Sequence, residues 1–354
     1  MSQFYNTGVE GQFERYFDID IETTTRCNAA CPMCFRNLSG DRINPDLNIE
    51  DFNTDWIDNI DLTLGTVSLC GNYGDPIMVN NLHQVLHDLN KKINWAPDHK
   101  IIIMTNGGAR TTDWWKELAD IMKTISVRSR VVFGIDGLED TNHLYRRNVN
   151  WNKLMKNVEA YISAGGRATW KMILFKHNQH QVEEAKKLAD DMGFAFFDKI
   201  ATNRFKNVKE DYQWPVLGKQ GEHLYSLEAS TLNTSKYRPR KLARKAKKVW
   251  TGEINCYANR DRSIYLAASG KVYPCPNTGY VYSAGQKRVV ETNETAPDNN
   301  LAHTRLSDII NGKFFTAMKK SHGDKDLCIP TCARTCGVKT DNLLKTEMLH
   351  SNWK

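Results

Sequence analysis

The sequence predicts an α/β protein built on parallel strands, arranged either as an open barrel or as a doubly wound sheet. Short apolar runs alternate with helical patterns from residue 17 to residue 201. The length of 354 residues leaves room for one large domain and a smaller one, and 40% hydrophobic residues suffice for a packed core. Strand, helix, strand repeats imply right-handed crossovers, so ligand-binding residues are expected where the strands end.

Six apolar runs are the predicted strands, and helical patterns separate them. Strands are expected at 17–23, 62–71, 100–106, 129–136, 167–175 and 194–201. Helices are expected at 49–59, 79–94, 111–126, 150–164 and 179–192, with caps at Thr111 and at Gly165-Gly166.

The alternation stops after about Thr202, which divides the chain. Residues 1–16 are interpreted as an N-terminal extension, 17–205 as the core, 206–250 as a basic linker with one helix, and 251–354 as a small cysteine-rich domain. Within this last part, SIYLAASGKVYPC predicts a β-hairpin that turns at Ser269-Gly270.

Charge and cysteine usage narrow the classes of function. Of the formal net charge of +7, eight basic residues lie between Lys236 and Lys248, so the remainder sums to about −1 and a nucleic-acid-binding surface is not expected. The basic run is either a solvated linker face or a docking strip for an acidic substrate. We expect a cytoplasmic protein without a membrane segment or signal peptide. Nine cysteines in that compartment predict metal ligands.

The first cysteine group, Cys27, Cys31 and Cys34, follows the first strand directly as CxxxCxxC. Three thiolates leave one corner of an iron–sulfur cluster open to a ligand, whereas closed structural sites use four. The alternative is a partial zinc site.

This loop resembles the cluster loop of the radical S-adenosylmethionine (radical SAM) superfamily, although Met33 stands where the family usually has an aromatic residue. The resemblance implies a partial (βα)6 TIM-like barrel and a [4Fe–4S] cluster whose open iron binds S-adenosylmethionine. It also implies an electron donor such as flavodoxin or ferredoxin. Reductive cleavage would give a 5′-deoxyadenosyl radical that abstracts hydrogen from the substrate.

Later strand ends resemble the family's cofactor loops in the same order. CGNYGDP at 70–76 resembles its glycine-rich GGEP segment, Thr105-Asn106-Gly107 its TNG, and Gly134-Ile135-Asp136-Gly137 its SxDG, with glycine replacing serine. The resemblance implies that Arg146, rather than Arg147, pairs with the methionine carboxylate. The cofactor-binding residues implied are Gly71, Tyr73, Gly74, Asp75, Asn106, Asp136, Arg146, Leu174, Phe175 and Asn178.

Two of these residues have a plainer interpretation, and the cysteine just before Gly71 has two interpretations. Leu174 and Phe175 are more typical of strand core. Cys70, which ends the second strand, is either an inert buried thiol or a hydrogen-atom donor in catalysis.

The second cysteine group resembles the auxiliary-cluster extension called SPASM, or its shortened form, Twitch. Cys256 and Cys275 bracket the predicted hairpin in CX13GX4C spacing, and Cys328, Cys332 and Cys336 follow. Five cysteines can close one four-thiolate cluster, so the resemblance implies one auxiliary [4Fe–4S] cluster held by four of the five. Which two of the last three take part is open, and a helix would bring all three to one face. A zinc-binding tail is the alternative.

Three functions are therefore considered. The first is a radical SAM enzyme that modifies a ribosomally made peptide. The second is a radical SAM enzyme that oxidises or rearranges a small polar molecule such as a sugar or aminocyclitol. The third is a non-enzymatic zinc protein that binds nucleic acid through the basic run.

Overall fold

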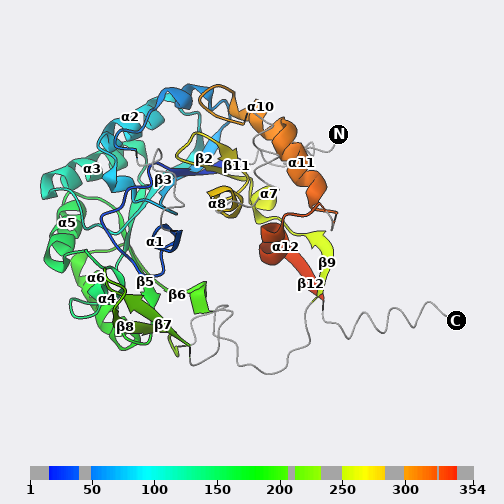
Figure 1. Cartoon of the computed structure of the whole chain (residues 1–354). Coiled ribbons are helices and arrows are strands. Elements are labelled where there is room, and N and C mark those ends of the chain that lie inside the picture. Colours follow the sequence, from blue (N-terminus) through cyan, green and yellow to red (C-terminus); the bar gives the residue numbers. More distant parts are fainter. Residues whose placement is uncertain are drawn as a thin grey trace.

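The core of the molecule is a curved sheet of eight strands that stays open, as Figure 1 shows. The computed structural model describes residues 16–39, 49–205, 212–232, 249–283, 299–324 and 327–340. The strand order is β11-β10-β1-β2-β3-β4-β5-β6, and β1 to β6 pair in parallel. The predicted partial barrel is confirmed. Its strands are β1 Phe17–Glu22, β2 Leu64–Cys70, β3 Trp95–Thr105, β4 Arg130–Gly134, β5 Ala168–Leu174 and β6 Phe196–Ala201.

Helices cover the outer side of this sheet (Figure 1). Both predicted caps are present. Thr111 accepts a hydrogen bond from the backbone N–H of Trp114 at the start of one helix, and Gly165 has φ +85° just after the end of another. The apolar helix faces pack on the sheet, where Trp115 lies 5.3 Å from Phe133 between ring centroids. These helices are α2 Leu82–Lys92, α3 Thr112–Ile125, α5 Trp151–Ser163 and α6 Val182–Met192.

The predicted helix at 49–59 is wrong for most of its length. Only a short 3₁₀ helix, η3 Asp55–Asn59, forms there. The Asn53 side chain accepts the backbone N–H of Asp55, a local contact that competes with helical hydrogen bonding. The other short elements of the core are α1 Phe35–Ser39, η4 Pro76–Met78, α4 Asn142–Tyr145, η5 Gln179–Gln181 and η6 Asn203–Phe205.

An antiparallel hairpin occupies part of the segment interpreted as a linker. It consists of β7 Gln213–Leu217 and β8 His223–Glu228. The hairpin is docked on the core, because the Tyr225 hydroxyl donates to the carbonyl of Leu144 at 2.7 Å and the N–H of Lys176 donates to the carbonyl of Glu228 at 3.1 Å. The basic run at 236–248 lies outside the described residues.

The predicted C-terminal hairpin is confirmed, with Gly270 in its turn at φ +80°. Its first strand, β10 Ser263–Leu266, pairs in parallel with β1 and so extends the barrel sheet, which the sequence did not predict. The second strand is β11 Val272–Tyr273, and a separate antiparallel pair joins β9 Val249–Ile254 to β12 Gly337–Thr340. The helices of this half are α7 Tyr257–Asp261, α8 Pro276–Ser283, α10 Leu306–Asn311, α11 Lys313–Ser321 and α12 Pro330–Cys336.

Packing attaches the C-terminal half to the β1 and β2 side of the barrel. The Asn59 side chain donates to the carbonyl of Leu301 at 2.8 Å, and Phe314 of α11 lies edge-on to Tyr273 of β11 with ring centroids 5.8 Å apart.

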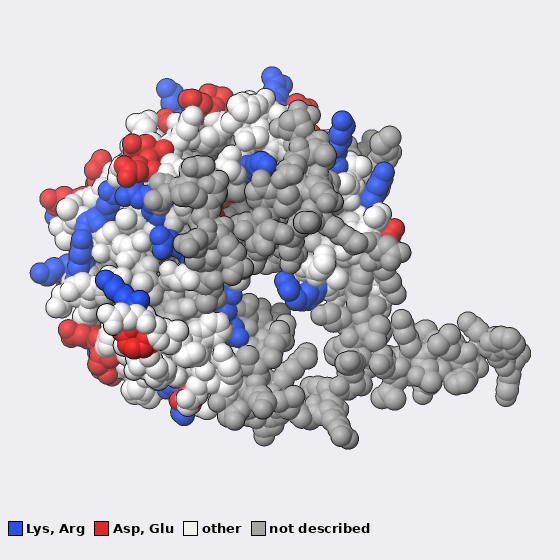
Figure 2. Space-filling model, in the orientation of Figure 1, with Lys and Arg blue, Asp and Glu red and all other residues white. Residues whose placement is uncertain are grey.

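On the face in Figure 2, Lys and Arg side chains are interspersed with Asp and Glu side chains over the described surface. No helix among the described residues is long and apolar enough to cross a membrane.

Candidate cofactor site and cysteine clusters

The loop after β1 gathers the first three cysteines. Cys31 is buried, Cys27 and Cys34 are half-buried, and all three thiols are free. The N–H of Cys34 donates to the carbonyl of Cys31, and the N–H of Ala29 donates to the Sγ atom of Cys27 at 3.4 Å. Met33, which replaces the expected aromatic residue, is fully buried, so an apolar side chain meets the packing demand. These contacts anchor the backbone of the loop.

Burial favours the protonated form of the Cys27 and Cys31 thiols. It raises the pKa of Cys27 to about 12, with further contributions from the Asp75 carboxylate and the neighbouring thiols. It raises the pKa of Cys31 to about 11, although Arg146 opposes the shift. Thiolates, not thiols, bind metals, so binding here would release protons. Within the described residues, no group of three or more His, Cys, Asp or Glu side chains is arranged to hold a metal ion.

The glycine-rich loop after β2 packs backbone against backbone. A Cβ atom on Gly71 would lie 1.7 Å from the carbonyl oxygen of Gly74, and one on Gly74 would lie 1.9 Å from that of Thr24. The N–H of Asp75 donates to the carbonyl of Arg26 at 2.8 Å, one residue before Cys27. Glycine is required at both positions, because the loop lies directly on the segment that leads into the cluster loop.

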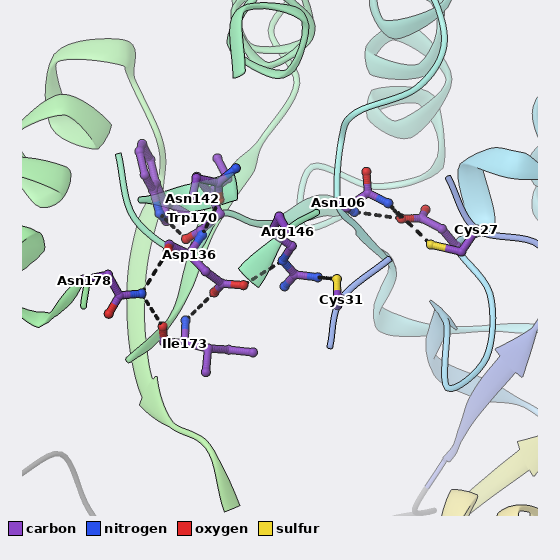
Figure 3. Close-up of polar contacts among 11 residues, drawn as sticks. Cys27, Cys31, Asn106, Asp136, Asn142, Arg146, Trp170, Ile173 and Asn178 are labelled. Atoms are coloured by element: carbon purple, nitrogen blue, oxygen red, sulfur yellow. Dashed lines mark hydrogen bonds and ion pairs between the residues drawn. The ribbon is translucent and has the colours of Figure 1, made fainter. Parts of the chain in front are cut away.

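The Asp75 carboxylate joins two of the predicted cofactor loops. It is 4% exposed and accepts hydrogen bonds from the backbone N–H of Asn106 at 2.8 Å, the Asn106 side chain at 2.6 Å and the N–H of Ile77 at 3.2 Å. The same Asn106 amide lies 3.7 Å from the Sγ atom of Cys27 (Figure 3). Protein groups thus occupy most of the hydrogen-bonding capacity of Asp75. The residue also connects the end of β3 to the cysteine loop.

Arg146 reaches from α4 to the cluster loop across the end of β4 (Figure 3). Its Nε atom donates to Asp136 at 2.7 Å, and its Nη1 atom lies 3.8 Å from the Sγ atom of Cys31. Burial alone would lower the pKa of Arg146, but the charge of Asp136 and the hydrogen bond to it outweigh burial and raise the pKa above its usual value. A Cβ atom on Gly134 would lie 2.4 Å from the Nη2 atom of Arg146. Glycine at this position therefore makes room for the guanidinium.

Asp136 and Asn178 hold the ends of β4 and β5 together (Figure 3). The second oxygen of Asp136 accepts the N–H of Ile173 at 2.6 Å, and the Asn178 side chain donates to the carbonyls of both Asp136 and Ile173 at 2.9 Å. Leu174 and Phe175 are fully buried beneath them, as core residues are. Arg147 lies apart from this network, because its side chain donates to the carbonyl of Leu217 in β7.

Glu22, the last residue of β1, belongs to the site and was not identified from the sequence. It is 2% exposed, and its carboxylate accepts hydrogen bonds from the N–H groups of Tyr73 and Gly74 in the glycine-rich loop. Burial raises the pKa of Glu22 to about 7. Cys70 is near it, and burial together with Asp20 and Glu22 raises the pKa of this thiol well above its ordinary value. Acidic residues alternate with apolar ones along β1, so Glu22 carried no distinct signal in the sequence.

Four of the five late cysteines line one cavity. Cys332 and Cys336 lie in α12 and line the cavity, whereas Cys328 precedes that helix and does not line the cavity. The N–H of Asn255 donates to the carbonyl of Cys336, which brings the end of α12 beside Cys256. The cavity is lined by Ile254, Cys256, Pro274, Cys275, Asn277, Thr278, Met318, His322, Thr331, Cys332, Thr335 and Cys336.

Comparisons with known proteins identify the barrel. Residues 21–189 match the profile of the radical SAM superfamily. The fold is similar to Streptococcus suis SuiB bound to S-adenosylmethionine, with 14% identity, a TM-score of 0.54 and 84% of this chain covered. The chain spans 66% of the length of SuiB, just under two thirds. It is also similar to anSMEcpe with bound AdoMet and a Kp18Cys peptide, with 13% identity, a TM-score of 0.54, and coverage of 91% of this chain and 88% of that one. No curated protein sequence matches the chain.

Proposed function

Residues 21–189 belong to the radical SAM superfamily, and from this premise we propose that the protein is an enzyme that cleaves S-adenosylmethionine reductively and modifies a peptide. The observation that carries the proposal is the convergence of the ends of β2, β3 and β4, through Asp75, Asn106 and Arg146, on the cysteine loop that follows β1. When bound, a [4Fe–4S] cluster supplies the electron that breaks the sulfonium C–S bond and so yields the radical that abstracts hydrogen.

The donor set of the first loop fits such a cluster. Three thiols come from one loop, and in a cluster each thiolate binds a different iron, so they need not converge on a single point as ligands of one ion do. Arg146 lies beside Cys31 and compensates negative charge there. Cys27, Cys31 and Cys34 would hold the cluster and leave one iron free for the methionine end of S-adenosylmethionine.

The remaining N–H groups of Arg146 are proposed to bind the methionine carboxylate. A guanidinium has five N–H donors, and the contacts with Asp136 and Cys31 occupy two. Asp136 orients the guanidinium and keeps it charged. Because the Asp75 carboxylate already accepts three hydrogen bonds, we assign it to shaping the glycine-rich loop, whose backbone would face the methionine ammonium.

The end of β5 is proposed to face the adenine ring. Leu174 and Phe175 support this segment from below, and Asn178 fixes its backbone by donating to the carbonyl of Ile173 and accepting the N–H of Phe175. These three residues would then act by making the segment rigid.

An auxiliary [4Fe–4S] cluster is proposed for the second cysteine group. The four thiols around one cavity, Cys256, Cys275, Cys332 and Cys336, match the four ligands of a closed cluster. Cys328 is the fifth, excluded thiol. We expect Cys328→Ala to keep the iron content of the native protein, about eight per chain, and Cys332→Ala to lose about four. Equal losses in the two variants would contradict the assignment.

A peptide is the proposed substrate class. SuiB is bound to precursor peptide SuiA in one structure, and anSMEcpe is bound to a peptide in another. A flavodoxin or ferredoxin is the proposed electron donor.

The function is tested with anaerobically purified protein reduced by dithionite. We expect a brown protein that converts S-adenosylmethionine to 5′-deoxyadenosine, and a triple variant with alanine at Cys27, Cys31 and Cys34 that does not. Incubation with candidate peptides and with small polar alcohols, followed by mass spectrometry, separates the two substrate classes. A colourless protein with stoichiometric zinc and no cleavage would refute the proposal.

A further inference from the structure

A single buried carboxylate connects the C-terminal hairpin to the glycine-rich loop. One oxygen of Glu22 accepts the N–H of Tyr73 at 2.6 Å and the N–H of Gly74 at 3.3 Å. Its other oxygen accepts a hydrogen bond from the Tyr265 hydroxyl. Successive backbone N–H groups that point to one place form a concave site for an anion, and the Glu22 carboxylate fills that site.

The sheet fixes the position of Tyr265. Strand β10 pairs in parallel with β1, and Tyr265 lies opposite Asp20, two residues before Glu22, so both side chains emerge on the same side of the sheet. The ring is 1% exposed and packs closely on α8, where a Cβ atom on Gly279 would lie 2.4 Å from Tyr265 Cε1. Helix α8 directly follows Cys275. The hydroxyl therefore has little freedom to leave Glu22.

The loop held by Glu22 also rests on the cluster loop. Gly74 packs on the carbonyls of Thr24 and Arg26, and Asp75 donates its N–H to Arg26. The loop is thus fixed from two sides, by Glu22 at Tyr73 and Gly74 and by Arg26 at Asp75. Loss of the Glu22 hydrogen bonds would let the glycine-rich loop turn about its remaining bond to Arg26. The cysteine side chains would keep all their own contacts.

We propose that Tyr265 and Glu22 are positioning residues for S-adenosylmethionine, so that the C-terminal hairpin completes the cofactor site of the barrel. The inference rests on the proposed function. Tyr265 orients Glu22, Glu22 orients the N–H groups of residues 73 and 74, and the carbonyl groups of the same loop then face the methionine ammonium. None of these hydrogen bonds joins Tyr265 or Glu22 to Cys27, Cys31 or Cys34.

Tyr265→Phe in the full-length protein tests the proposal, since it removes one hydroxyl and keeps the ring. We expect unchanged iron content and an unchanged EPR spectrum of the reduced cluster without S-adenosylmethionine. We expect the Kd for S-adenosylmethionine to rise about tenfold, as loss of one hydrogen bond to a charged group predicts. The EPR change on adding S-adenosylmethionine should shift to higher concentration by the same factor. Tyr161→Phe, which alters another fully buried tyrosine on α5, is the matched control and should bind like the native protein.

Glu22→Gln provides a second variant, because glutamine keeps an oxygen that can accept the loop N–H groups. It should weaken binding less than Glu22→Ala, and adding Tyr265→Phe to Glu22→Ala should cost nothing further. If the native protein binds S-adenosylmethionine and Tyr265→Phe binds it equally well, the inference fails and the proposed function stands. Loss of iron in Tyr265→Phe would assign the tyrosine a purely structural role and also overturn it. Failure of the native protein to bind S-adenosylmethionine would refute the proposed function itself.

Discussion

Replacement of Gly134 by alanine should displace Arg146 and weaken binding of S-adenosylmethionine. The added Cβ atom would lie 2.4 Å from Nη2 and 2.9 Å from Cζ of Arg146. Because an ordinary contact needs about 3.4 Å, the guanidinium must move by about 1 Å. Its Nε bond to Asp136 is 2.7 Å long and does not survive such a shift.

The cost follows from what that bond holds. Asp136 is fully buried, and a hydrogen bond to a charged group contributes about 1.5–3 kcal/mol. We therefore expect a loss of about 2 kcal/mol, which lowers the melting temperature by roughly 3 °C and raises the Kd for S-adenosylmethionine roughly 30-fold if Arg146 binds its carboxylate.

Anaerobic equilibrium binding and thermal unfolding measure the two effects. Gly323→Ala is the control, because a Cβ atom there meets nothing within 4 Å, and it should match the native protein in both assays. A Gly134→Ala protein with native affinity and native melting temperature would refute the reasoning that glycine makes room for Arg146.

Three further outcomes follow from individual contacts. Asp75→Asn should weaken S-adenosylmethionine binding and lower stability by about 1–3 kcal/mol, because an amide cannot accept all three hydrogen bonds of that carboxylate; native values in both assays would contradict this. Burial raises the pKa of Glu22 from its ordinary 4.5 to about 7, so its contribution to stability is full below pH 4.5 and is lost as the pH rises to 7. Glu22→Gln should remove that dependence, about 1.4 kcal/mol per pH unit, in unfolding experiments between pH 5 and 7, and an unchanged slope would rule Glu22 out as its source. Tyr225→Phe should cost about 1 kcal/mol and increase proteolysis within β7 and β8, whereas a native cleavage rate would show that the hydroxyl bond to Leu144 does not hold the hairpin.

The barrel was predictable because its signals are local. Each strand is a short apolar run such as Ile101–Ile103, and the helices carry caps such as Thr111 that act within three residues. The elements that were predicted wrongly or missed depend on contacts distant in the sequence or on competing local hydrogen bonds. The hairpin β7–β8 is short, carries Pro215 and exposes much of its surface, so it lacks an apolar pattern.

Spacing located the cysteines but could not choose among them. Which late thiols share a cavity depends on the pairing of β9 with β12, which places Cys336 beside Cys256. Glu22 was missed for the same reason, because its hydrogen-bond partner Tyr265 lies 243 residues further along the chain. A register between strands so far apart leaves no mark in either segment alone.

The parallel pairing of β10 with β1 has a consequence for synthesis on the ribosome. Within the described residues, β10 is the strand that pairs with the outer edge of β1, and it follows β2 to β6 along the chain, so this edge stays unpaired during synthesis until β10 has emerged. Contacts of such long range form slowly and leave intermediates open to aggregation. Assembly of the proposed cluster is therefore expected to follow the pairing of β10 with β1.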